Sequence, residues 1–161
     1  MSRLSCGAFR APALAVLGLT TAMGMTIPAG AADATGHSSP VGVWEGTVRH
    51  GAGTDDLVLA FHADGSVCLA VTGVPDGGRA GGEGSWRAAG PDMFSYVVKE
   101  WLYDATGAVT GSVDIDQRAV QRAGTFDSTG VSKIYDAQGA YVGSTEAEVS
   151  ARRGGAQPKC P

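Results

Sequence analysis

The sequence predicts an all-β domain, an antiparallel up-and-down barrel of eight strands, with a two-sheet β-sandwich as the alternative. The first observation is a near-repeat: residues 103–112 and 135–144 agree at seven of ten positions and share the motif Tyr-Asp-Ala-x-Gly. An Asp and a Gly around small residues, between β-forming runs, are typical of a hairpin turn. Residues 63–66 contain a related Asp-Gly turn, which we expect at the same end of the barrel as the two repeated turns. The second observation is that no stretch of the mature chain keeps a helical apolar period for long.

Runs of β-branched and aromatic residues alternate with Gly, Asp and Pro at short intervals, which is typical of strands joined by tight turns. Residues 114–122 carry a thin helical pattern, and we interpret them as extended rather than helical. Closing the strands into a barrel removes the sheet edges that would otherwise be exposed. The expected strands lie near residues 41–49, 56–62, 67–73, 84–88, 93–103, 108–116, 121–134 and 141–151.

The longest and most Gly-rich connection is residues 75–84. We interpret it as a surface loop. The functional alternative is a lid over the mouth of the barrel, because loops on a rigid scaffold often carry binding residues.

The N-terminal residues 1–31 have the features of a secretory signal peptide, namely two arginines as the only charges, an apolar stretch and a small-x-small cleavage site. A transmembrane anchor is the alternative, but glycines interrupt the apolar stretch and a proline follows it. Residues 32–40 are small and polar and are expected to form a flexible lead-in. Residues 41–161 have the length of one β-barrel domain. The sequence therefore predicts a secreted, extracellular protein.

The net charge of the mature chain argues against two classes of binding partner. Removing residues 1–31 leaves 10 Lys and Arg against 16 Asp and Glu, a formal charge of −6. Phosphate binding requires clustered cations, so nucleic acid is not an expected partner. The same charge argues against attraction to an anionic membrane surface, and no membrane insertion is expected after signal cleavage.

Cleavage would also remove Cys6 and leave Cys68 and Cys160. In an oxidising compartment such a pair is expected to form one disulfide. Two free thiols or a soft-metal pair are the alternative. The disulfide would hold the C-terminal tail against the strand that contains Cys68.

Side-chain alternation assigns the faces of the strands, because successive residues of a strand point to opposite sides. Residues 94–102 show a mostly apolar face, which is expected to point inward, and a polar face with Ser95 and Lys99. By the same test Cys68 and His62 point outward. The expected interior consists of Trp44, Leu57, Leu59, Phe61, Val67, Leu69, Val71, Trp86, Phe94, Tyr96, Val98, Glu100, Leu102, Val113, Ile115, Phe126, Ala147 and Val149.

Glu100 is the strongest candidate for chemistry because it interrupts an apolar inward face. A buried carboxyl has a raised pKa and can act as a general acid or base, or receive a polar group of a ligand. The structural alternative places Glu100 at the mouth of the barrel or in a pair with an arginine. Tyr96 lies two positions earlier on the same face and can donate a hydrogen bond into the same space, or serve in core packing.

The other polar residues do not predict a site. The spacing of His37, His50 and His62 supports neither a catalytic dyad nor a zinc site, and no metal is expected. The carboxylates of Asp114 and Asp116 share one face of a strand, but such a pair is more typical of a solvated surface than of a calcium site.

Two features resemble the lipocalins and the wider calycin barrels. Residues 42–44 have the form Gly-x-Trp at the start of the first strand, and Arg152 and Arg153 follow the last strand. In those barrels a Trp on the first strand closes the base and an Arg from the last strand packs across its ring. Other lipocalin motifs, such as Thr-Asp-Tyr, are not present in recognisable form. The resemblance implies a cup-shaped interior that accepts one small, mostly apolar molecule.

These observations leave three functional hypotheses. The leading one is a secreted barrel that binds a small apolar or amphipathic molecule without a cofactor. The first alternative is a cofactor-free cyclase or isomerase of the allene oxide cyclase or spirotetronate cyclase type, with Glu100 and Tyr96 as its catalytic residues. The second is a structural or protein-interaction module with a filled core. The residues expected to line or close the cavity are Trp44, Phe61, Trp86, Phe94, Tyr96 and Glu100.

Overall fold

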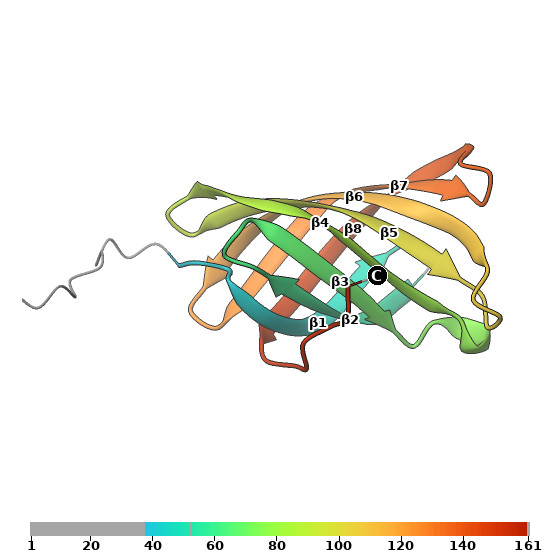
Figure 1. Ribbon diagram of the computed structural model, residues 1–161. Helices are drawn as coiled ribbons and strands as arrows, with labels where there is room; N and C mark the ends of the chain where they lie inside the picture. The colour runs from blue at the N-terminus through green and yellow to red at the C-terminus, as the bar shows by residue number, and fades with distance from the viewer. Residues whose placement is uncertain (1–37, 52, 161) are drawn as a thin grey trace, which may run out of the picture. The chain divides into compact units, whose positions relative to one another are not determined.

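The protein forms a closed barrel of eight antiparallel strands, as the sequence predicts. The computed structural model describes residues 38–51 and 53–160. Each strand pairs with its neighbours in the sequence, and β1 also pairs with β8, which closes the barrel (Figure 1). The strands are β1 Gly42–His50, β2 Gly53–Phe61, β3 Ser66–Thr72, β4 Arg79–Gly90, β5 Met93–Tyr103, β6 Val109–Arg122, β7 Thr125–Asp136 and β8 Tyr141–Arg153, with a short 3-10 turn, η1, at Pro75–Gly77.

The fourth strand is much longer than the sequence analysis expected. Residues 79–84, interpreted as part of a loop or lid, are strand residues. Their glycines permit this, because a Cβ on Gly82 or Gly84 would collide with the backbone of β5. Glycines in a strand often mark such close backbone approach. The Gly-rich sequence therefore belongs to the wall of the barrel, and only residues 73–78 connect β3 to β4.

The boundary between β6 and β7 was also predicted wrongly. The expected break at residues 117–120 lies inside β6, so the weak helical pattern over residues 114–122 is extended as interpreted. The chain turns instead at residues 123–124, where Ala123 has a φ of 52°. The turn lacks the Asp-Gly or Asn-Gly signal that would have revealed it.

The repeated motif forms two equivalent turns. Asp104 Oδ1 accepts hydrogen bonds from the backbone N–H groups of Thr106 and Ala108, and Asp136 Oδ1 accepts the corresponding bonds from Gln138 and Ala140. The glycine of each motif has a positive φ, 85° and 81° respectively. The duplicated sequence thus encodes the same local geometry at both hairpins.

These two turns lie at one end of the barrel, together with the connections β1–β2 and β3–β4. We call this the open end. The Asp64 turn was expected to join them, but it connects β2 to β3 and therefore lies at the opposite end, with residues 91–92 and 123–124. The up-and-down order requires this, because alternate connections fall at alternate ends. We call the opposite end the closed end.

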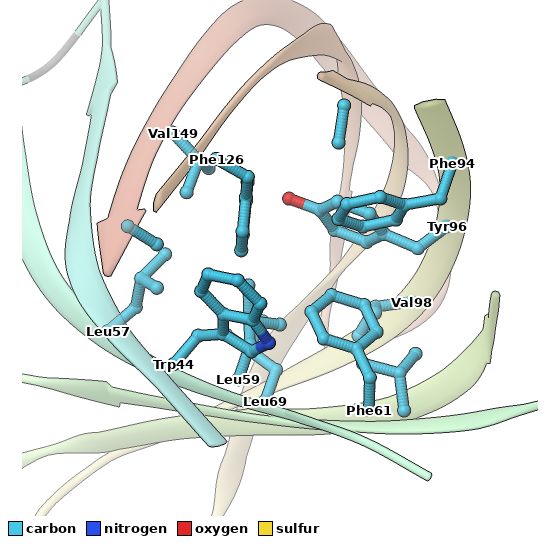
Figure 2. Close-up of a cluster of buried hydrophobic side chains, with 13 residues drawn as sticks. Trp44, Leu57, Leu59, Phe61, Leu69, Phe94, Tyr96, Val98, Phe126 and Val149 are labelled. Carbon is cyan, nitrogen blue, oxygen red and sulfur yellow. The ribbon is translucent and has the colours of Figure 1, made fainter. Parts of the chain in front are cut away.

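The closed half of the barrel is filled by aromatic rings. Phe61 contacts Phe94 and Tyr96 with ring centroids 5.2 and 5.5 Å apart, and Phe126 lies edge-on to Trp44 at 5.1 Å. Figure 2 shows these rings pointing toward one another between the strands. Edge-to-face contacts of this kind add to the stabilisation from burial. We call these five residues the aromatic layer.

Trp44 closes the base of the barrel. Its side chain is fully buried, and its indole N–H donates a 2.6 Å hydrogen bond to the carbonyl of Pro40. The guanidinium of Arg153 lies 4.4 Å from the ring centroid, so the expected stacking of an arginine on this Trp is confirmed. Arg153 also donates to the carbonyls of Ser39 and Val41. Both Arg152 and Arg153 belong to β8 itself rather than following it.

The described end of the expected lead-in, residues 38–40, is thus bonded to the base of the barrel. The predicted signal peptide, residues 1–31, lies outside the described residues.

Cys68 and Cys160 form a disulfide, as predicted, with their Cα atoms 5.4 Å apart. After β8 the C-terminal tail crosses β1 and β2 to reach β3 (Figure 1). The Gly154 N–H donates to the Val43 carbonyl at the start of this path. The tail covers the outward-pointing side chain of Cys68, which is why that residue is buried although it faces away from the interior.

Candidate ligand cavity

The open half of the barrel is hollow. A cavity of about 260 Å³ lies between the aromatic layer and the open end. This is close to the lower limit of roughly 300–1,000 Å³ that ligand pockets usually have, so it suits a small ligand. All eight strands contribute apolar side chains to its wall, which include Val48, Leu57, Leu69, Ala80, Leu102, Val113, Ile134 and Ala147.

Glu100 is the carboxyl group of this cavity that the sequence predicted. It is 8% exposed and lies on the inner face of β5, three residues before the strand ends at the open end. Burial in apolar surroundings raises the pKa of Glu100 to about 7, the nearby charge of Asp55 raises it as well, and His50 lowers it. At neutral pH the group can therefore accept or donate a proton.

His50 and Asp55 form a pair beside Glu100 that the sequence analysis missed. The His50 Nε2 atom lies 2.8 Å from Asp55 Oδ2, and both residues line the cavity. The pair is an ion pair at the edge of the cavity, and the expectation that the histidines form no catalytic dyad stays a prediction. The first expected strand ended at residue 49 and the second began at residue 56. The alternation of inward and outward side chains was therefore not applied to His50 and Asp55. Extended by one residue, it places His50 in phase with Val48, and Asp55 in phase with Leu57.

Tyr96 lies at the floor of the cavity. It is buried, and its hydroxyl lies 3.0 Å from the Ser128 hydroxyl, within hydrogen-bond distance. Burial raises the pKa of Tyr96 far above its ordinary value, whereas the bond to Ser128 acts in the opposite direction. The phenol is therefore neutral at any physiological pH.

Gln117 and Ser132 also border the cavity and were not among the residues predicted from the sequence. The Gln117 amide donates to the carbonyl of Ala147 at 3.3 Å, and its Oε1 has no hydrogen-bond partner among the described residues. The alternation of inward and outward side chains could have revealed Gln117, since it lies two residues after Ile115 on the inner face of β6.

Of the six predicted ligand-binding residues, Tyr96 and Glu100 line the cavity. Trp44, Phe61 and Phe94 belong to the aromatic layer beneath it. Trp86 packs edge-on to Phe61, and its indole N–H donates to the His62 carbonyl near the closed end. Their role in binding a ligand stays a prediction, but the structure places four of the six below the cavity rather than around it.

In the described part of the chain, one group of side chains has the spacing of metal ligands, namely His62, Cys68 and Cys160. The two cysteines are joined in the disulfide, and a disulfide sulfur is not a thiolate ligand. The other pair considered, Asp114 and Asp116, is part of the outer wall, where Asp114 binds Lys99 at 2.9 Å. Among the described residues there is also no helix with the length and apolarity to cross a membrane.

No family model and no curated protein matches the chain. We therefore classify the protein by its fold and its cavity. It is a small, closed, antiparallel β-barrel, consistent with a calycin-like fold, and one half of its interior is filled while the other half is hollow.

The charge state of Glu100 makes the stability of the barrel depend on pH. The folded-state pKa of about 7 exceeds the ordinary value of 4.5, so between these values the folded chain holds a proton that the unfolded chain has lost. The contribution of Glu100 to the free energy of unfolding is therefore fully present below pH 4.5 and is lost as the pH rises to 7. The expected loss is about 3 kcal/mol, since one pKa unit corresponds to about 1.4 kcal/mol.

Glu100→Gln should remove this loss. We expect the variant to unfold with a free energy up to about 3 kcal/mol higher than the wild type at pH 8.5 and with an equal free energy at pH 4. Urea denaturation at the two pH values measures the difference. Glu146→Gln, on the exposed face of β8, is the matched control. An equal response of the two variants would contradict the assigned burial.

Proposed function

We propose that the chain is an exported barrel that binds a small apolar or amphipathic molecule in its interior without a cofactor. The observation that carries this proposal is the cavity, whose apolar wall is interrupted by one buried carboxyl group and whose floor is a packed aromatic layer. An apolar wall with a few placed polar groups is the usual composition of a small-molecule site.

Two further observations support the proposal. The stacking of Arg153 on Trp44 is the arrangement that the resemblance to lipocalins implied, and it makes a lipocalin-like ligand-binding barrel the favoured class. The disulfide between Cys68 and Cys160 is compatible with an oxidising, extracellular compartment and so supports export. A structural module with a filled core has less support, because the open half is hollow.

The test is to identify molecules that stay in the cavity. Wild type, Ala147→Phe and Val131→Phe are purified in parallel and denatured, and the released molecules are identified by mass spectrometry. Ala147 is buried in the cavity wall, whereas Val131 is exposed on the outer face of β7. We expect one compound that the wild type and Val131→Phe retain and that Ala147→Phe lacks.

A thermal unfolding curve of each variant tests whether Ala147→Phe is folded, because an added ring can overpack the interior. Val113→Phe, also in the cavity wall, is the second filling variant. Retention of the same compounds by all four proteins would contradict a ligand in this cavity.

A cofactor-free cyclase or isomerase is the second candidate, favoured by the pKa of Glu100 near 7 inside an apolar cavity. In this case Glu100 transfers a proton and Tyr96, held by Ser128, orients the substrate. Glu100→Gln separates the two candidates. A carrier keeps its affinity for an uncharged ligand, whereas a general acid or base loses roughly 10²-fold or more in rate.

A further inference from the structure

Among the described residues that line the cavity, three of the four ionisable groups lie at its open end. Glu100 comes from β5, His50 is the last residue of β1, and Asp55 is near the start of β2. Tyr96, at the floor, is the fourth. The described lining residues of β3, β4, β6, β7 and β8 are not titratable. The cavity is therefore apolar at depth and acidic at its mouth.

The charges at the mouth do not balance. Two carboxyl groups face one imidazole, and the described residues of the lining include neither a lysine nor an arginine. Asp55 is engaged by His50. In the described residues, no hydrogen bond or ion pair reaches the Glu100 carboxyl. A carboxylate in apolar surroundings is costly unless a cation or a hydrogen-bond donor accompanies it.

The volume of the cavity limits the size of the ligand. At about 30 Å³ for each water-sized group, 260 Å³ holds roughly nine groups. A molecule of about ten non-hydrogen atoms therefore fills the space. Its apolar part would lie against Leu59 and Leu69 near the aromatic layer, and its polar end would lie at the mouth.

We propose that the ligand is a small amphipathic amine, with its ammonium group against Glu100 at the open end and its apolar part in the cavity. This inference rests on the proposed function, because it assigns the chemistry of the ligand that the cavity would bind. An ammonium supplies the donor and the charge that Glu100 lacks. A carboxylate ligand of the same shape is rejected, because it would face both Glu100 and Asp55.

Binding of the amine is coupled to the pH. The ammonium favours the ionised form of Glu100, so amine affinity rises as the pH increases through the titration range of that carboxyl. The groups that face Glu100 across the cavity are Asp55, which opposes its ionisation, and His50, which favours it. An uncharged ligand shows a much smaller dependence on pH.

The experiment compares three probes with the same eight-carbon chain by calorimetric titration at pH 8, namely 1-octylamine, 1-octanol and octanoate. We expect octylamine to bind about tenfold or more tighter than octanol, since a charged hydrogen bond contributes roughly 1.5–3 kcal/mol. Octanoate should bind most weakly. In Glu100→Gln the octylamine affinity should fall to that of octanol, while the octanol affinity stays within about twofold. Glu146→Gln should leave all three affinities unchanged.

The outcomes separate the two proposals. If octanol binds the wild type as tightly as octylamine, the amine inference is wrong and the proposed function stands. If none of the three probes binds, both are wrong. If Glu100→Gln weakens octanol and octylamine equally, Glu100 has a structural role and the inference is overturned. If Ala147→Phe still prefers octylamine, the amine binds elsewhere on the acidic surface, which also overturns it.

Discussion

Trp44→Ala is expected to lower the free energy of unfolding by about 5 kcal/mol, at the upper end of the range for removal of a buried Trp. The ring is fully buried and contacts Phe126, so its loss leaves a large cavity in the aromatic layer. It also leaves the Pro40 carbonyl without its donor and the Arg153 guanidinium without its aromatic partner. Urea denaturation measures the change.

Two matched variants serve as controls for Trp44→Ala. Trp44→Phe keeps most of the apolar area but loses the indole N–H, and we expect a smaller loss of about 1–2 kcal/mol from the unpaired carbonyl. Trp101→Ala removes the same side chain from the outer wall of β5, where the ring is half-buried beside Lys99. We expect a loss of about 1 kcal/mol there. Equal losses for Trp44→Ala and Trp101→Ala would contradict the assignment of Trp44 as the plug of the barrel.

Cys160→Ser is expected to lower the free energy of unfolding by about 4 kcal/mol. The disulfide joins residues 92 positions apart, and the chain-entropy model assigns a loop of this length about 4 to 5 kcal/mol. Cys160 is the better residue to replace, because it is exposed and its serine remains solvated, whereas Cys68 is buried. Urea denaturation with and without reductant provides the measurement.

The reductant supplies the internal control. The wild type should fall to the stability of Cys160→Ser when it is reduced, and Cys160→Ser should not respond to the reductant. Intact mass after alkylation without reductant provides a separate check. Two alkylated thiols on the purified protein would show that Cys68 and Cys160 are not bonded.

The sequence predicted the fold because the relevant signals are local. Turn residues such as Asp104 and Asp136 bind the backbone two and four residues further on, so their effect does not depend on the rest of the chain. Alternation along a strand assigned the inner faces of β2, β3 and β5 for the same reason. The two errors in strand boundaries arose where the signal is not local. The glycines of β4 are explained by the neighbouring strand, and the turn at Ala123 has an uncommon sequence.

The candidate site was only half predicted. Glu100 was identified because it interrupts an apolar face within one strand. His50 and Asp55 were missed because their strands extend further toward the open end than their sequences indicate. Residues from β1, β2 and β5 become neighbours of one cavity only after the barrel closes through the pairing of β1 with β8.

By itself, the sequence determined the strand order, the hairpin turns that contain an Asp and a Gly, most inward faces, and Glu100 as an unusual inward residue, since each depends on a local pattern along the chain. The cysteine pair followed from the cysteine count and the predicted export. Only the tertiary structure decided that the aromatic rings fill one half of the interior and leave about 260 Å³ in the other. It also decided that His50 and Asp55 lie beside Glu100 at the mouth. The physical reason is that free volume and electrostatic coupling depend on distances across the barrel, and those distances are set by closure and side-chain packing.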